Sequence, residues 1–216
     1  MHNRITRAAI PVTLVLIAAF AGGMTSGSPQ STSKGKRKPM TQGKVVAVIE
    51  TTLGTIEAEL YPGDAPKTVE NFVGLAGKKY FDGIIFPRVV PGFVIQGGDP
   101  TGTGTGGESI WGKEFGDELN PATASYKAGY AKGVLAMANR GPNTNTSQFF
   151  IMLADNTTLP KNYTIFGKVV KGIEVVDAIG TTALTGGMGP DASKPVTPVA
   201  MKKVSIRQAP APAKKD

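Results

Sequence analysis

The sequence predicts a mainly β domain in which short strands form a closed barrel or sandwich capped by helices. The 28 glycines and 16 prolines among 216 residues favour many turns and short strands over long helices. Short apolar or alternating runs, typical of strands, recur along the whole body of the chain, and helical spacing occurs in only two segments. Because 40% of the residues are hydrophobic, the chain can bury one domain core and still carry extensions.

The body of the chain begins with a predicted hairpin and a predicted helix. Residues 45–50 form a nearly unbroken apolar run, and residues 55–60 alternate apolar and polar after Gly54, a pattern typical of two paired strands. Apolar residues then recur at helical spacing between residues 65 and 76. Asp64 is a candidate cap and Pro66 fits the first turn, so this segment predicts one amphipathic helix.

Six more strand-like runs and one short helix follow. The runs span residues 84–90, 93–97, 134–138, 148–153, 165–170 and 199–206, and the helix fits residues 173–179. Residues 102–107 match the GxGxxG fingerprint of dinucleotide-binding proteins, but no helical periodicity follows them, so we interpret them as a flexible loop. Residues 155–158 lack the spacing of a calcium-binding EF-hand and are interpreted as a polar turn.

The two ends of the chain differ in composition from its body. Arg4 and Arg7 precede an apolar stretch that ends at Ala21, which predicts a bacterial secretory signal over residues 1–21. The alternative is an uncleaved anchor, although the apolar stretch is short against the ~20 residues that span a bilayer. Residues 22–43 are predicted to form a flexible basic tether, 44–207 the domain and 208–216 an unstructured tail. We therefore expect an exported protein with no stable membrane insertion after cleavage.

Charge and residue types exclude several classes of protein. The net charge is +8, but residues 1–43 carry +6 and residues 208–216 carry +1, so the predicted domain carries only +1. A basic groove is therefore not expected, and nucleic acid is a poor candidate partner. The chain has no cysteine, and its single histidine is His2, which removes thiolate nucleophiles, serine-histidine triads and paired-histidine zinc sites from the domain.

Three long blocks of the body carry a specific resemblance. They are FPRVVPGFVIQGGD (86–99), MANRGPNTNTSQFFI (137–151) and YTIFGKVVKG (163–172), and they resemble, in the same order, the signature blocks of the cyclophilin family of prolyl isomerases. The resemblance runs from about residue 45 to 207. It implies a closed eight-stranded antiparallel β-barrel capped by two α-helices, and an enzyme that isomerises X-Pro bonds of polypeptides without cofactor or metal. We expect a monomer.

The resemblance also implies the residues of a site. Arg88 is identified as the catalytic residue, and the backbone of Asn139 is expected to pair with the substrate. The other implied substrate-binding residues are Phe93, Val94, Gln96, Ala138, Gln148, Phe150, Leu159 and Tyr163. Four positions depart from the family pattern: Pro87 and Tyr163 stand where histidines are common, Val94 replaces a methionine, and Thr158 replaces a tryptophan that binds cyclosporin.

These residue types suit the chemistry of prolyl isomerisation. Rotation about an X-Pro bond meets a barrier of ~18–20 kcal/mol because the twisted amide loses resonance, and no bond to carbon breaks. The reaction needs no nucleophile, only a site that binds the twisted state best. Arg88 can donate a hydrogen bond to the pyramidal prolyl nitrogen while aromatic residues hold the ring. The hypothesis is an isomerase that assists folding of exported or envelope proteins; the alternative is a proline-peptide binding module or chaperone with little turnover.

Overall fold

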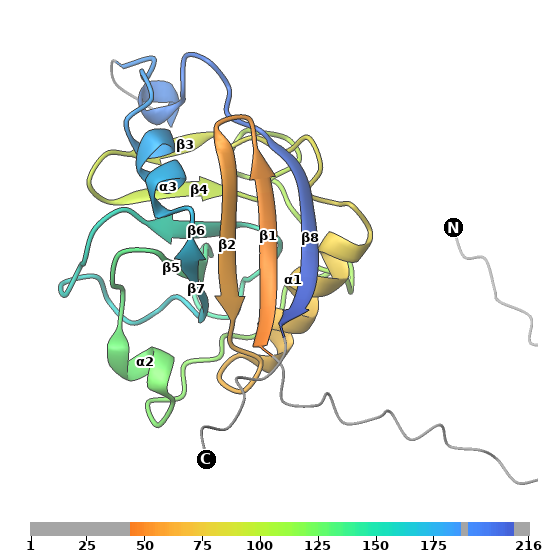
Figure 1. Cartoon of the computed structure of the whole chain (residues 1–216). Helices are drawn as coiled ribbons and strands as arrows, with labels where there is room; N and C mark the ends of the chain where they lie inside the picture. The colour runs from red at the N-terminus through yellow and green to blue at the C-terminus, as the bar shows by residue number, and fades with distance from the viewer. Residues whose placement is uncertain (1–43, 187–189, 210–216) are drawn as a thin grey trace, which may run out of the picture. The chain divides into compact units, whose positions relative to one another are not determined.

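The computed structural model describes residues 44–186 and 190–209 (Figure 1). The predicted signal, the predicted tether and residues 210–216 of the predicted tail lie outside the described residues. The elements, in chain order, are β1 (Lys44–Thr51), β2 (Gly54–Leu60), α1 (Pro66–Gly77), β3 (Arg88–Val90), β4 (Val94–Gly97), α2 (Ala124–Ala128), β5 (Val134–Met137), β6 (Phe149–Met152), β7 (Ile165–Lys171), α3 (Ile173–Gly180), a 3-10 turn (Pro190–Ser193) and β8 (Met201–Ala209).

Eight strands form one antiparallel sheet in the order β3-β4-β6-β5-β7-β2-β1-β8. Figure 1 shows the long strands β2, β1 and β8 side by side, with α1 beside β8 and α3 beside β2. Each predicted strand run overlaps one of these strands, so the β-rich prediction is confirmed. β8 also extends beyond residue 207, because Gln208 and Ala209 still pair with Val45 and Lys44.

The sheet curls into a half-barrel and does not close, so the prediction of a closed barrel is wrong. β3 and β8 are the two edge strands, and they do not pair with each other. Only the segment before β3 reaches across: the Phe86 N–H donates to the Val199 carbonyl at 2.9 Å and the Met201 N–H donates to the Ile84 carbonyl at 2.8 Å.

The concave side of the sheet holds the main hydrophobic core. Phe72 of α1 stacks on Phe81 with ring centroids 4.9 Å apart and meets the edge of Phe149 at 5.5 Å. The rings of Phe81 and Phe149 are fully buried, and Phe72 is only 2% exposed. Replacing Phe72 by alanine would therefore cost ~3–5 kcal/mol of folding free energy, since the cavity could not refill. This core fixes the strands whose convex side carries the candidate site.

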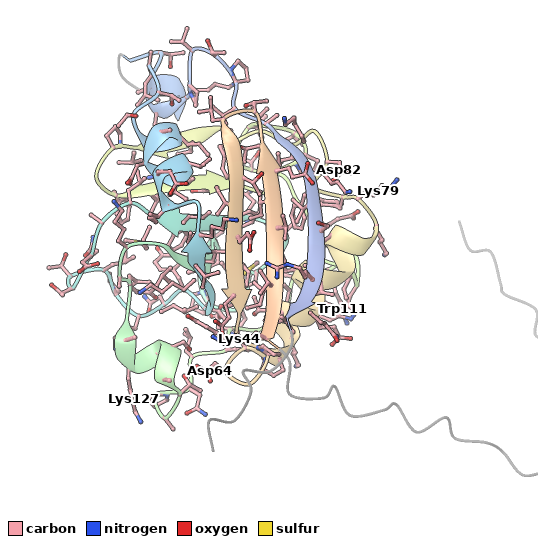
Figure 2. All side chains as sticks on the ribbon, in the orientation of Figure 1. Lys44, Asp64, Lys79, Asp82, Trp111 and Lys127 are labelled. Carbon is pink, nitrogen blue, oxygen red and sulfur yellow. The ribbon has the colours of Figure 1, made fainter. Side chains whose placement is uncertain are left out.

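The helix α1 begins at Pro66, as predicted, but its cap comes from elsewhere. Ala65 occupies the N-cap position without a side-chain hydrogen bond. The Glu118 carboxylate accepts from the backbone N–H groups of Lys67 at 3.0 Å and Thr68 at 2.8 Å, and so satisfies two donors that helix geometry leaves free. The predicted cap, Asp64, instead accepts from the Ser125 N–H at 2.9 Å, beside α2 (Figure 2).

The described residues contain three α-helices where the sequence predicted two. α3 (Ile173–Gly180) agrees with the prediction for residues 173–179. α2 has only five residues, too few to show a helical period in the sequence. Its signals are local: the Thr123 side chain caps its start, and Gly129 at φ 72° ends it. Within residues 44–186 and 190–209, no helix is long and apolar enough to cross a membrane.

Candidate active site

Strand register places three of the candidate residues in one row. Across β3, β4 and β6, Arg88 pairs with Gln96, and Gln96 pairs with Phe150. Directly opposed residues of antiparallel strands point to the same face, and their neighbours point to the other. The neighbours Val89 and Ile95 are fully buried in the main core. Arg88, Gln96 and Phe150 therefore share the convex face of the half-barrel.

A hollow of about 230 Å³ lies on this face. Nine residues line it: Arg88, Phe93, Val94, Gln96, Ala138, Asn139, Phe150, Leu159 and Tyr163. All nine belong to the predicted site, so the structure brings them together. The tenth predicted residue, Gln148, stands behind Gln96 and is 7% exposed. The volume falls below the ~300–1,000 Å³ of pockets for drug-sized ligands and cofactors, and suits one small ring.

A second apolar cluster forms the floor of the hollow. Val94 is 2% exposed and Phe150 is 6% exposed, and Phe93, Leu159 and Tyr163 pack against this cluster. The Tyr163 ring meets the Phe150 ring edge-on, with centroids 5.6 Å apart. Edge-to-face aromatic pairs at this distance fix ring orientation beyond simple burial. The floor can therefore hold a pyrrolidine ring by apolar contact.

Tyr130 braces this floor, and sequence reasoning missed it. Its hydroxyl accepts from the Tyr163 N–H at 3.0 Å and donates to the Tyr163 carbonyl at 2.9 Å. The side chain is 4% exposed, and burial raises the pKa of Tyr130 to about 12. Tyr130 lies outside the three sequence blocks, so no motif pointed to it.

The polar rim is a chain of three side chains. One Arg88 Nη donates to Gln96 Oε1 at 3.2 Å, and Gln96 Nε2 donates to Gln148 Oε1 at 2.8 Å. Arg88 is exposed, and within the described part of the chain no carboxylate forms an ion pair with it. Its remaining N–H donors are thus available to a ligand in the hollow.

Asn139 lines the same hollow and leaves its backbone groups unpaired among the described residues. Its side-chain amide is engaged: Nδ2 donates to the Asn162 carbonyl at 3.0 Å, and Oδ1 accepts from the Gly141 N–H at 3.3 Å. Its own N–H and C=O have no hydrogen-bond partner among residues 44–186 and 190–209. An extended peptide could pair with these groups in a strand-like mode.

Residues 102–107 and Thr158, both singled out in the sequence, lie outside the lining of the hollow. Residues 102–107 form a loop, and no helix follows until α2, as expected for a segment that is not a dinucleotide fingerprint. Thr158 is exposed and bonds Asn156 Oδ1 through its N–H and its hydroxyl, both at 3.0 Å, outside the lining of the hollow. In the described ranges, no cluster of three or more histidine, cysteine or acidic residues could hold a metal ion.

Comparison with known proteins gives a consistent family. The family model described as cyclophilin type peptidyl-prolyl cis-trans isomerase/CLD matches residues 46–206. Peptidyl-prolyl cis-trans isomerase CYP18-1 of Arabidopsis thaliana is 45% identical over 162 residues, covering 75% of this chain and 96% of the relative. Peptidyl-prolyl cis-trans isomerase ppi1 of Schizosaccharomyces pombe is 54% identical over 132 residues, covering 61% and 83%.

Solved structures agree with these relatives. A cyclophilin type peptidyl-prolyl cis-trans isomerase of Cryptosporidium parvum aligns with a TM-score of 0.69 and 37% identity, covering 78% of this chain and 99% of the other. The same isomerase, crystallised in the presence of the dipeptide Ala-Pro, aligns with a TM-score of 0.68 and the same identity, covering 76% and 99%.

Proposed function

This chain belongs to the cyclophilin-type peptidyl-prolyl cis-trans isomerases, and we propose that it isomerises X-Pro bonds of exported or envelope proteins, assisting their folding. The observation that supports catalysis is Arg88 at the edge of an apolar hollow, with donors left free for a ligand. Export is inferred from the sequence of residues 1–21 alone, because the names of the relatives say nothing of it.

In this proposal, different residues bind the prolyl ring and the peptide beside it. Phe93, Phe150 and Tyr163 hold the prolyl ring, while the free backbone groups of Asn139 pair with the extended peptide beside it. Neither contact depends on the angle of the X-Pro bond, so both bind planar and twisted states alike. Uniform binding of this kind lowers KM and leaves the barrier of the bound substrate unchanged.

Arg88 supplies the interaction that differs between the states. A planar amide nitrogen has no available lone pair, because resonance shares it with the carbonyl. Rotation makes the prolyl nitrogen pyramidal and able to accept a hydrogen bond, which the guanidinium donates. Gln96 holds one nitrogen of the Arg88 fork, so the remaining donors keep a fixed direction. A preorganised charged donor of this kind stabilises developing electron density without reorganising during the reaction.

The test is an isomerisation assay on residues 22–216, coupled to a protease that cleaves only the trans peptide, with an Ala-Pro peptide as substrate. We expect turnover, together with saturable peptide binding measured by titration. A folded protein that binds the peptide without turnover would overturn catalysis and make the chain a proline-peptide binding module. Export is tested separately, by the intact mass of the protein recovered from its native host.

A further inference from the structure

The most buried carboxylate near the site lies outside the hollow. Asp99 is 1% exposed and follows β4. Its Oδ1 accepts from the Thr101 N–H and the Thr101 hydroxyl, both at 2.8 Å. Its Oδ2 accepts from the N–H groups of Gly104 at 2.7 Å and Gly106 at 3.1 Å, and from the Thr103 hydroxyl at 3.4 Å. The loop of residues 100–106 is thus wrapped around one carboxylate.

This carboxylate stays ionised at ordinary pH. Burial alone would raise the pKa of Asp99, but the hydrogen bonds from Thr101, Gly106 and Gly104 outweigh burial and hold the pKa below its ordinary value. The wrap is also tight, because a Cβ placed on Gly106 would lie 2.3 Å from Asp99 Oδ1. The loop therefore has little freedom to move away from the carboxylate while Asp99 is charged.

The same loop residues touch the site from their other side. Gln148 Nε2 donates to the carbonyl of Gly104 at 3.0 Å and to the carbonyl of Gly106 at 2.7 Å. The N–H groups of these two glycines are the ones that Asp99 holds. Hydrogen bonds thus connect the Asp99 carboxylate, through the backbones of Gly104 and Gly106, to the side chain of Gln148.

The polarity of this chain determines what faces Arg88. Two carbonyls can only accept, so they select the Nε2 end of Gln148 and turn its Oε1 end toward Gln96. Gln96 must then present its Nε2 to Gln148, which leaves its own Oε1 for the Arg88 guanidinium. If the two carbonyls withdrew, both amides could flip, and Gln96 would present an NH₂ group to a cation.

We propose that Asp99 is a positioning residue for catalysis, which fixes the orientation of Gln148 and Gln96 and thereby aims Arg88. This inference rests on the proposed catalytic role of Arg88. Asp99 is not among the residues that line the hollow. Its loss leaves the apolar floor and the Asn139 backbone in place, so peptide binding persists. The direction of the Arg88 donors becomes variable, and the bound substrate is isomerised more slowly, so kcat falls.

The first experiment compares Asp99→Asn with Glu118→Gln. Glu118 is the control because its carboxylate likewise accepts from backbone N–H groups and a hydroxyl, two and one against three and two for Asp99, at the start of α1 and outside the lining of the hollow. Both variants should lower the melting temperature. Only Asp99→Asn should lower kcat, by about tenfold, with KM within about twofold of wild type. Equal kcat values for wild type and folded Asp99→Asn would overturn the proposal.

A double-mutant cycle tests the route. In a Gln148→Met background the chain is already broken, so adding Asp99→Asn should change kcat by less than about twofold while still lowering the melting temperature. A further tenfold loss would show that Asp99 acts by some path other than Gln148. Wild type without turnover would instead refute the proposed function, which keeps the two failures apart.

A second variant covers the case in which Asp99→Asn does not fold. Gly106→Ala keeps every hydrogen-bonding group of the loop but drives a methyl group into the carboxylate. Gly77→Ala is its control, because a Cβ there meets nothing within 4 Å. Gly106→Ala should lower kcat with KM preserved, and Gly77→Ala should change neither. Unchanged kcat in folded Gly106→Ala would contradict the proposal.

Discussion

Replacing Tyr130 by phenylalanine removes one oxygen that serves two hydrogen bonds. The Tyr163 N–H and carbonyl both lose their partner, and Tyr163 itself lines the hollow. The ring of Tyr130 remains, so its packing near Phe150, with centroids 6.5 Å apart, is kept. The change therefore isolates the hydroxyl.

The expected loss follows from burial. Two net hydrogen bonds of ~0.5–1.5 kcal/mol each, with partners left partly desolvated, give a destabilisation of ~1–3 kcal/mol. For a domain of this size, that lowers the melting temperature by roughly 2–12 °C. KM for a proline peptide should rise, because Tyr163 is held less firmly in the floor of the hollow, while kcat changes little.

Calorimetry and denaturant titration measure this loss, and Tyr126→Phe is the matched control. Lys161 Nζ lies 4.6 Å from the centroid of the Tyr126 ring, and the Tyr126 hydroxyl bonds no residue among those described. Removing that hydroxyl should therefore cost less than ~0.5 kcal/mol of folding free energy. If the two variants were equally stable, the bracing role of Tyr130 would be wrong.

The pKa of Tyr130 adds a pH dependence with a definite sign. Its folded pKa is raised to about 12 from an ordinary value of 10.0. The folded state therefore holds the proton more tightly, so the stability contribution is complete below pH ~10 and is lost as the pH rises through ~12. Tyr130→Phe should lack this alkaline loss.

Three further predictions concern export, drug binding and pH. Export should remove the first ~20–25 residues, and an intact mass that still includes Met1 in a membrane fraction would support the anchor alternative. Cyclosporin should bind wild type weakly and Thr158→Trp more tightly, because threonine lacks the indole donor and broad apolar face; equal titrations would contradict this. Turnover should be nearly constant between pH ~6 and ~9, because residues 44–216 contain no histidine or cysteine. A bell-shaped profile of kcat with the fold intact would reveal a titrating group.

The elements that the sequence predicts well are those with a local pattern. The alternation over residues 55–60 and the helical spacing over residues 65–76 correspond to β2 and α1. α2 escaped because five residues carry no period. Closure of the barrel was also mispredicted, because pairing between the edge strands β3 and β8 would join segments distant in sequence, which no local pattern shows.

The site also contains residues that the sequence predicts and residues that it does not. The nine residues that line the hollow come from long sequence blocks, and strand register gathers them. Tyr130 and Asp99 act through partners distant in sequence or through backbone groups, so residue type gave no sign of either. The hydrogen bond from the Thr68 N–H at the start of α1 to Glu118, 50 residues away, is another contact that only the folded structure shows.

The most direct test of the account measures turnover and peptide affinity together for Arg88→Ala and Arg88→Lys. Losing a charged donor to a developing acceptor should raise the barrier by roughly 2.7–4 kcal/mol, by analogy with oxyanion-hole deletions, or about two to three orders of magnitude in kcat. Lysine keeps the charge without the planar fork, so it should recover little. Affinity for an Ala-Pro peptide and the melting temperature should change far less, because Arg88 is exposed and the floor is intact. Near-wild-type turnover in folded Arg88→Ala would contradict the central claim.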